Sequence, residues 1–170
     1  MPTIRPMTSA DADAVLQIYQ EGIDTGHATF ERDPADWAKF DAGKLARPRL
    51  VAQGDSGDVL GWAVLSPMSS RCVYGGVAEL TIYIAAAARG QGIGKALLMA
   101  LVEASEAEGL WTLVAGIMRE NEASIRLHEA CGFELLGYRK RIGKMGFGPM
   151  KGKWRDIAWM ERRSEVVGVG

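Results

Sequence analysis

Apolar side chains recur at two different spacings along the chain, and these spacings predict its secondary structure. Recurrence every three or four residues is typical of amphipathic helices, whereas short apolar runs bounded by Gly, Pro or Asp are typical of strands. The predicted strands are Thr3–Pro6, Arg49–Gln53, Val59–Leu65, Ala78–Ile84, Thr112–Ile117, Phe133–Tyr138 and Ile157–Met160. Because helical patterns alternate with these strands, the sequence predicts one mixed α/β domain.

Four segments have the helical spacing, and polar caps or glycines mark several of their ends. The predicted helices run from Thr8 or Ser9 to Gly26, from Asp33-Pro34 through Leu45, from Gly92 to Glu108 and from Glu122 to Cys131. The second of them is expected to bring Trp37, Phe40 and Leu45 inward. Residues 139–153 are basic and rich in glycine, and we expect them to separate the last two strands.

The composition is that of an ordinary globular domain, with 48% hydrophobic and 24% charged residues in a chain of 170. A net charge of −1 argues against general nucleic-acid binding. The start lacks the apolar region of a signal peptide, and no run of about 18 apolar residues occurs, so we expect no membrane segment and a cytoplasmic location. With two His, two Cys and no metal-ligand spacing, we expect no metal site and two free thiols.

Three glycines alternate in the segment Arg89–Lys95, directly after a predicted strand and before a predicted helix. A nucleoside-triphosphate loop needs four residues between its glycines and a hydroxyl after its Lys. Here three residues separate Gly90 from Gly94, and Ala96 follows the Lys. A dinucleotide loop needs Gly-x-Gly-x-x-Gly, but Lys95 stands at the third glycine position. The spacing therefore excludes both kinds of loop.

The segment fits a third pattern, Arg/Gln-x-x-Gly-x-Gly, in which Arg89, Gly92 and Gly94 hold the fixed positions. Glycine permits a positive φ and leaves room for an anion, so that N–H groups at the helix start can point at a pyrophosphate. Arg89 and Lys95 add positive charge at its rim. On the pattern alone, the alternative is a turn that only joins a strand to a helix.

Around this loop the chain resembles the GNAT superfamily of acetyl-CoA-dependent N-acetyltransferases over nearly its whole length. The stretch AELTIYIAAAARGQGIGKALL is similar to that family's central strand, loop and helix, and ENEASIRLHEACGF to the motif that follows. The segments TFERDPADW, LHE and GKWRD, with a Glu opening the central strand, resemble the phosphinothricin acetyltransferase branch. The resemblance implies a GNAT domain over residues 1–163, with a mixed, mostly antiparallel sheet flanked by helices, and a tail over 164–170.

The resemblance also implies that acetyl-CoA is the co-substrate, and it assigns residues to that molecule. The pyrophosphate is expected on backbone N–H groups of the glycine loop, and the pantetheine arm is expected to pair with the backbone of the central strand. Polar side chains further along are expected to contact the cofactor beyond the loop. The residues so assigned are Ile82, Tyr83, Ile84, Arg89, Gly90, Gln91, Gly92, Ile93, Gly94, Lys95, Asn121 and Ser124.

Acetyl transfer requires a neutral amine, because an ammonium has no lone pair, and a modest base suffices for an α-amino group with a pKa of about 7.7–8.0. Glu79 matches the family position for this base; the alternative is a strand-end carboxylate held in a salt bridge. His128 stands where many GNAT enzymes have a Tyr. It is a candidate acid for the departing thiolate or a substrate contact; the alternative is a histidine packed under the cofactor.

The acceptor is expected opposite the cofactor, under the segment SSRCVYGG. Arg71 is the candidate for binding a substrate carboxylate or phosphinate, with a solvated loop arginine as the alternative. Cys72, Val73 and Tyr74 flank it, and Phe30 belongs either to the pocket or to the core. This loop lacks the Trp-Arg and Phe-Arg spacing of the branch, so phosphinothricin, methionine sulfoximine and an arsenic analogue all stay open as acceptors.

The sequence therefore predicts an enzyme that moves acetyl from acetyl-CoA to the α-amine of a small amino-acid-like substrate by direct attack. The alternatives are acetylation of a protein N-terminus, a lysine or a polyamine, and a non-catalytic module that senses acyl-CoA. The resemblance implies a homodimer, and we expect no nucleic-acid or membrane partner.

Overall fold

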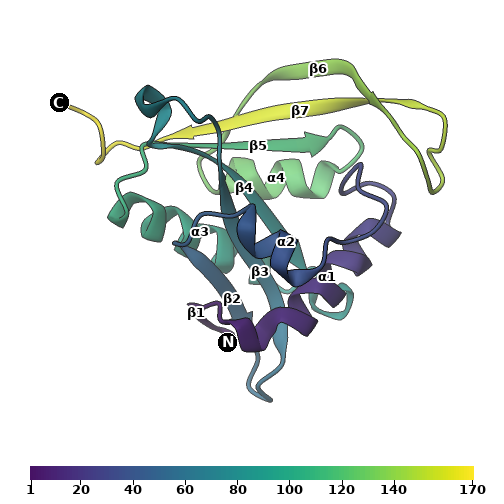
Figure 1. Cartoon of the computed structure of the whole chain (residues 1–170), viewed down its shortest axis with the longest axis horizontal. Helices are drawn as coiled ribbons and strands as arrows, with labels where there is room; N and C mark the ends of the chain where they lie inside the picture. Colours follow the sequence, from purple (N-terminus) through teal and green to yellow (C-terminus); the bar gives the residue numbers. More distant parts are fainter.

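The computed structural model describes all 170 residues and contains one seven-stranded sheet. The strands are β1 (Thr3–Pro6), β2 (Arg49–Gln53), β3 (Val59–Pro67), β4 (Val77–Ile84), β5 (Thr112–Met118), β6 (Glu134–Lys144) and β7 (Trp154–Arg163). Their order is β1-β2-β3-β4-β5-β7-β6, and only β4 and β5 run parallel (Figure 1). The predicted mixed, mostly antiparallel α/β sheet is therefore confirmed.

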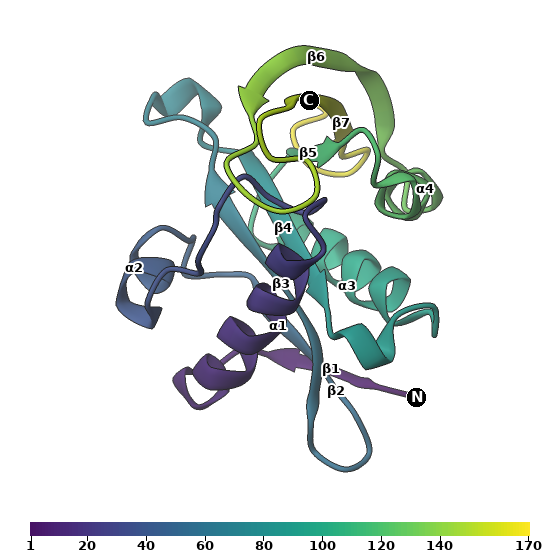
Figure 2. The same cartoon turned by 90° about the vertical axis from the view of Figure 1, so that its right-hand side faces the viewer.

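Four α-helices and three short 3-10 helices connect the strands. They are η1 (Ser9–Asp11), α1 (Ala12–Asp24), α2 (Trp37–Ala42), η2 (Cys72–Tyr74), η3 (Ala86–Ala88), α3 (Ile93–Ala107) and α4 (Glu122–Ala130). Helices α1 and α2 lie on one side of the sheet and α3 on the other, as Figure 2 shows. No helix combines the length and the apolar character needed to cross a lipid bilayer.

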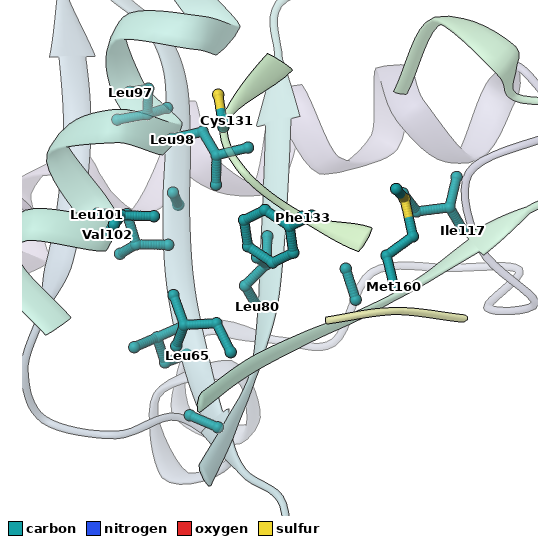
Figure 3. Packing of buried hydrophobic residues seen from close by; sticks show 14 of the residues in the cluster. Leu65, Leu80, Leu97, Leu98, Leu101, Val102, Ile117, Cys131, Phe133 and Met160 are labelled. Carbon is teal, nitrogen blue, oxygen red and sulfur yellow. The ribbon is translucent and has the colours of Figure 1, made fainter. Parts of the chain in front are cut away.

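The larger core lies between α3 and the sheet, where side chains of α3 pack against β3, β4 and the segment after α4 (Figure 3). The residues labelled there are Leu65, Leu80, Leu97, Leu98, Leu101, Val102, Ile117, Cys131, Phe133 and Met160. Alternate residues of β3 serve the other face, where Trp62 and Val64 pack against Val15 and Ile18 of α1. Because successive side chains of a strand point to opposite faces, one sheet can pack against helices on both sides.

The two strands at the C-terminal end are much longer than predicted. β6 continues to Lys144 and β7 begins at Trp154, so only residues 145–153 connect them, and the prediction of a connection over 139–153 was wrong. β6 is an edge strand that is exposed along most of its length, so it lacks the apolar alternation that marks a half-buried strand. Its pairing with β7 holds it instead.

Helix α2 is shorter than predicted and leaves Leu45 outside it. The side chain of Asp36 caps the helix by accepting from the Lys39 N–H at 2.9 Å, and the helix ends before Gly43. The chain then runs beside the end of β3, where the Leu45 N–H donates to the Leu65 carbonyl at 2.8 Å. This contact fixes the residues between α2 and β2 against the sheet.

Strands β4 and β5 pair only at their beginnings. The parallel register joins Val77–Glu79 to Thr112–Val114 and stops there. Beyond that point the two strands separate, which Figure 1 shows as β4 and β5 leaving a common end in different directions. The facing backbone groups of Leu80–Ile84 and Ala115–Met118 therefore have no partner strand between them.

Candidate active site

A pocket of about 1240 Å³ occupies the opening between β4 and β5. Leu80–Ile84 line one wall and Ala115–Met118 the other. Backbone N–H and C=O groups that face such a gap bind an extended ligand in the manner of an added strand. Ile82, Tyr83 and Ile84, assigned from the sequence to the pantetheine arm, lie on this wall.

The glycine loop forms one end of the pocket. Gly90 and Gly92 have φ angles of 74° and 79°, and Gly92 is the N-cap of α3. A Cβ at either position would meet no atom within 4 Å, so both face open space, and both line the pocket. Because the first N–H groups of a helix have no intrahelical partner, the start of α3 is suited to an anion.

The charged and polar side chains of this loop differ in what they reach. Arg89 and Lys95 are exposed and line the pocket, and Arg89 Nε donates to the Ile84 carbonyl at 3.2 Å. Gln91 and Ile93 do not line it. The Gln91 amide donates to the Ala87 carbonyl at 2.9 Å, and Ile93 is buried in the core. Gln91 and Ile93 can therefore contact a ligand only through their backbone groups.

Asn121 connects the other side of the pocket to the segment after α1. Its Oδ1 accepts from the Ser124 N–H at 3.3 Å and so caps α4, while Nδ2 donates to the His27 carbonyl at 3.4 Å. Asn121 and Ser124 both line the pocket. The cap is a local reason for an Asn at this position, independent of any ligand.

His128 lies in the pocket wall with 1% of its surface exposed. Its Nδ1 is 2.7 Å from the Ser124 carbonyl, an oxygen that only accepts, so we place the ring proton on Nδ1. Nε2 is buried and has no partner. Burial lowers the pKa of His128 below its ordinary value. The ring is therefore neutral, with an unused acceptor at Nε2.

Arg155 is a buried residue that does not line the pocket but contacts residues that do, and the sequence interpretation missed it. Its Nη1 donates to the Gly26 carbonyl at 2.9 Å, and its Nη2 donates to His27 Nδ1 at 2.8 Å and to Glu120 Oε2 at 3.1 Å. His27 and Glu120 line the pocket. Arg155 thus joins the segment after α1 to the segment before α4. The GKWRD segment was the only sequence signal for it, because nothing in the apolar pattern marks a buried Arg.

Glu79 lies where β4 and β5 begin to separate, half-buried and lining the pocket. It takes part in no salt bridge, so the alternative of a salt-bridged carboxylate at the strand end has no support. Ser66 stands directly opposite it on β3. Lys44, a second residue that the sequence interpretation missed, donates from Nζ to Ser66 Oγ at 3.2 Å and also lines the pocket.

Aromatic rings line the pocket around Tyr83, four residues beyond Glu79 on β4. Trp62 stacks on Tyr83 with ring centroids 5.0 Å apart, and Tyr19 meets both rings edge-on. Burial raises the pKa of the Tyr83 phenol, so that it is neutral. Phe30, left open between pocket and core, is 38% exposed and lines the pocket.

The four residues of the segment SSRCVYGG that were assigned to the acceptor lie outside the pocket. Arg71, Cys72, Val73 and Tyr74 are exposed and none of them lines the pocket. The guanidinium of Arg71 lies 5.5 Å from the centroid of the Tyr74 ring. The structure therefore brings together the predicted base, Phe30 and the predicted cofactor residues other than Gln91 and Ile93, but not these four.

The comparisons with known proteins agree with this geometry. A model of the acetyltransferase (GNAT) family matches residues 13–133. The L-methionine sulfoximine/L-methionine sulfone acetyltransferase of Pseudomonas aeruginosa is 34% identical over 164 residues, which cover 94% of this chain and 92% of the relative. The crystal structure of a GNAT superfamily phosphinothricin acetyltransferase from Sinorhizobium meliloti, in complex with AcCoA, has a TM-score of 0.86 and 35% identity, covering 99% of this chain and 91% of that one.

A third similar protein has a name of a different kind. The crystal structure of ribosomal-protein-alanine N-acetyltransferase from Brucella melitensis has a TM-score of 0.82 and 33% identity, and it covers 95% of this chain and 99% of that one. The fold is therefore shared by proteins named for small and for macromolecular acceptors.

Fold, site and comparisons together define a class, the acyltransferases that take their acyl group from coenzyme A. The chain belongs to the GNAT acetyltransferase family. It is an acetyl-CoA-dependent N-acetyltransferase, and acetyl-CoA is its co-substrate.

Proposed function

We propose that the enzyme acetylates the α-amino group of a small amino-acid-like acceptor, with Glu79 as the general base. The observation that carries this proposal is the position of the Glu79 carboxylate. It faces the pocket where β4 and β5 separate, and no cation within the protein is paired with it. A carboxylate left free at that point is available to an ammonium that enters the pocket.

In the proposed acetyl transfer, Glu79 accepts one proton. Acetyl-CoA supplies the acetyl group as a thioester. Glu79 takes a proton from the acceptor ammonium, directly or through a water, and the freed lone pair forms the N–C bond as the C–S bond breaks. The nitrogen that has formed the new bond gives up its second proton to the departing thiolate. The products are therefore the N-acetyl acceptor and the thiol of coenzyme A, and no covalent bond to the protein is needed. Backbone N–H groups of β4 are proposed to polarise the thioester carbonyl.

The pocket also suggests where acetyl-CoA is held. The pyrophosphate is proposed on the N–H groups at the start of α3, beside Arg89 and Lys95. The pantetheine arm is proposed along Ile82–Ile84, where β4 has no partner strand. Asn121 and Ser124 are proposed to contact it from α4.

His128 is better suited to packing and accepting a hydrogen bond than to donating a proton. Its only N–H is directed at the Ser124 carbonyl, and burial lowers its pKa. An acid for the departing thiolate would need a proton on Nε2, which is the unprotonated nitrogen. We therefore favour the packing alternative for His128, with Nε2 as an acceptor for a donor on the bound ligand.

Methionine sulfoximine, methionine sulfone and phosphinothricin are the acceptors supported by the names of similar proteins. The arsenic analogue of phosphinothricin belongs to the same chemical class. A protein N-terminus is the second candidate, favoured by the similarity to the ribosomal-protein-alanine enzyme. The two candidate acceptors differ in size, so a panel of amines distinguishes them.

Thiol release from acetyl-CoA across a panel of amines tests the proposal. The panel contains methionine sulfoximine, methionine sulfone, phosphinothricin, spermidine, a lysine peptide and a peptide with an N-terminal Ala. We expect turnover with the first three at much lower KM than with the others. Turnover confined to the peptides or to spermidine would overturn the proposed substrate class. Acetyl-CoA binding without turnover of any amine would favour a sensing module instead.

The homodimer and the cytoplasmic location expected from the sequence stay predictions. Light scattering of the purified protein during size exclusion measures the first, and fractionation of source cells measures the second.

A further inference from the structure

Lys44 is a cation inside the pocket that has no acidic partner. The residue is half-buried, between α2 and β2, and its Nζ donates to Ser66 Oγ at 3.2 Å. It takes part in no salt bridge, although it lines the same pocket as Glu79. Its Nζ lies over the Phe40 ring, 5.5 Å from the centroid. A cation placed in this way is held in position without being neutralised.

The sheet register sets Lys44 and Glu79 on the same face. Ser66 and Glu79 are directly opposite on neighbouring antiparallel strands, so their side chains project from the same side of the sheet. Because Lys44 Nζ donates a hydrogen bond to Ser66, the ammonium lies on the same side of the sheet as the Glu79 side chain. Burial lowers the pKa of Lys44, and the nearby carboxylate of Glu79 opposes that effect. The two charges therefore influence each other while no ion pair closes the space between them.

Other cations lie near Lys44 or line the pocket, but Lys39 and Arg139, which line it, are exposed. Arg49 forms an ion pair with Asp41 and donates to the Leu45, Asp41 and Lys44 carbonyls. Arg71, which the sequence suggested for the substrate carboxylate, lies outside the pocket. Lys44 is thus the half-buried cation at the Glu79 end of the pocket.

An unpaired carboxylate and an unpaired ammonium in one pocket complement the two charges of an α-amino acid zwitterion. We infer that Lys44 binds the α-carboxylate of the acceptor while Glu79 receives its ammonium. This inference rests on the proposed function and deepens it, since it predicts a preference for free α-amino acids over polyamines. A polyamine would place a second positive charge against Lys44, which costs binding energy.

The test compares methionine sulfone with its methyl ester, which keeps the amine and removes the carboxylate charge. In the unaltered enzyme we expect kcat/KM for the acid to exceed that for the ester by about 10- to 100-fold, the range for one charge-assisted hydrogen bond. Lys44→Met should remove this preference through KM for the acid and leave KM for acetyl-CoA unchanged. Lys44→Arg should restore part of the preference, and the exposed Lys151→Met should keep all of it.

The outcomes separate this inference from the proposed function. Equal use of acid and ester by the unaltered enzyme, or a preference that survives in Lys44→Met, overturns the role of Lys44 and leaves the proposed function standing. Failure of the unaltered enzyme to acetylate any α-amino acid overturns the proposed function and the inference with it. The acid and ester comparison needs no variant, so it holds even if Lys44→Met folds poorly.

Discussion

Arg155 donates a 2.8 Å hydrogen bond to Nδ1 of His27, across 128 positions of the chain. Arg155 comes from β7 and His27 from the segment that follows α1, and no other buried cation links these parts. Because the guanidinium also holds the Gly26 carbonyl and Glu120, one side chain sets the wall of the pocket on two sides. A lost contact here affects stability and site geometry together.

Arg155→Met is expected to lower the free energy of unfolding by about 2–4 kcal/mol, because Glu120, His27 and the Gly26 carbonyl lose a buried partner. Urea unfolding at pH 7.5 measures this. The matched control is Arg126→Met, which removes an exposed ion pair with Glu122 on α4 and is expected to cost much less. Equal losses in the two variants would mean that the Arg155 contacts contribute no more than a surface pair.

Gly92→Ala is expected to weaken acetyl-CoA binding, and Gly109→Ala is not. Both glycines have a left-handed φ, 79° and 83°, and in both a Cβ would meet no protein atom within 4 Å. The backbone strain should therefore be similar, roughly 1 kcal/mol of stability in each. Only Gly92 lines the pocket. Calorimetric titration with acetyl-CoA compares them, and equal affinities would remove the start of α3 from the proposed binding site.

The buried His128 is expected to make stability depend on pH. Burial lowers its pKa in the folded state from the ordinary value of 6.5. Below pH 6.5 the unfolded chain therefore takes up a proton that the folded chain does not, so stability falls as the pH falls. His128→Asn removes this contribution, and its unfolding free energy should change less between pH 7.5 and 5.5. Parallel curves for the two proteins would show that His128 is free to ionise in the fold.

The sequence predicted the parts of the fold that repeat an apolar pattern. The faces of α3 and β3 follow from spacing, and the glycines at 92 and 109 mark both ends of α3. The strand predicted for β6 was too short, because an exposed edge strand has no such pattern. The end of α2 depends on a contact between Leu45 and β3 that lies outside the helix.

The residues of the candidate site also divide into those that the sequence predicted and those that it did not. Glu79, the glycine loop and Asn121 occupy positions set by local motifs, and the pocket is lined by Glu79, Asn121 and most of the loop. Lys44 has no motif, and the GKWRD segment that contains Arg155 gave no sign of its role, since both residues are positioned by contacts with residues far along the chain. The Arg71 segment shows the opposite case, in which a suggestive motif lies outside the pocket.

The central claim is that the pocket acetylates amines with Glu79 as base, and the activity of Glu79→Gln tests it most directly. The variant keeps the shape of the side chain and loses the basic oxygen. We predict that it binds acetyl-CoA with the affinity of the unaltered enzyme while kcat/KM for methionine sulfone falls by about 100- to 10,000-fold. Glu134→Gln, on the exposed edge strand, is the control and should keep full activity. A fully active Glu79→Gln enzyme would contradict the claim.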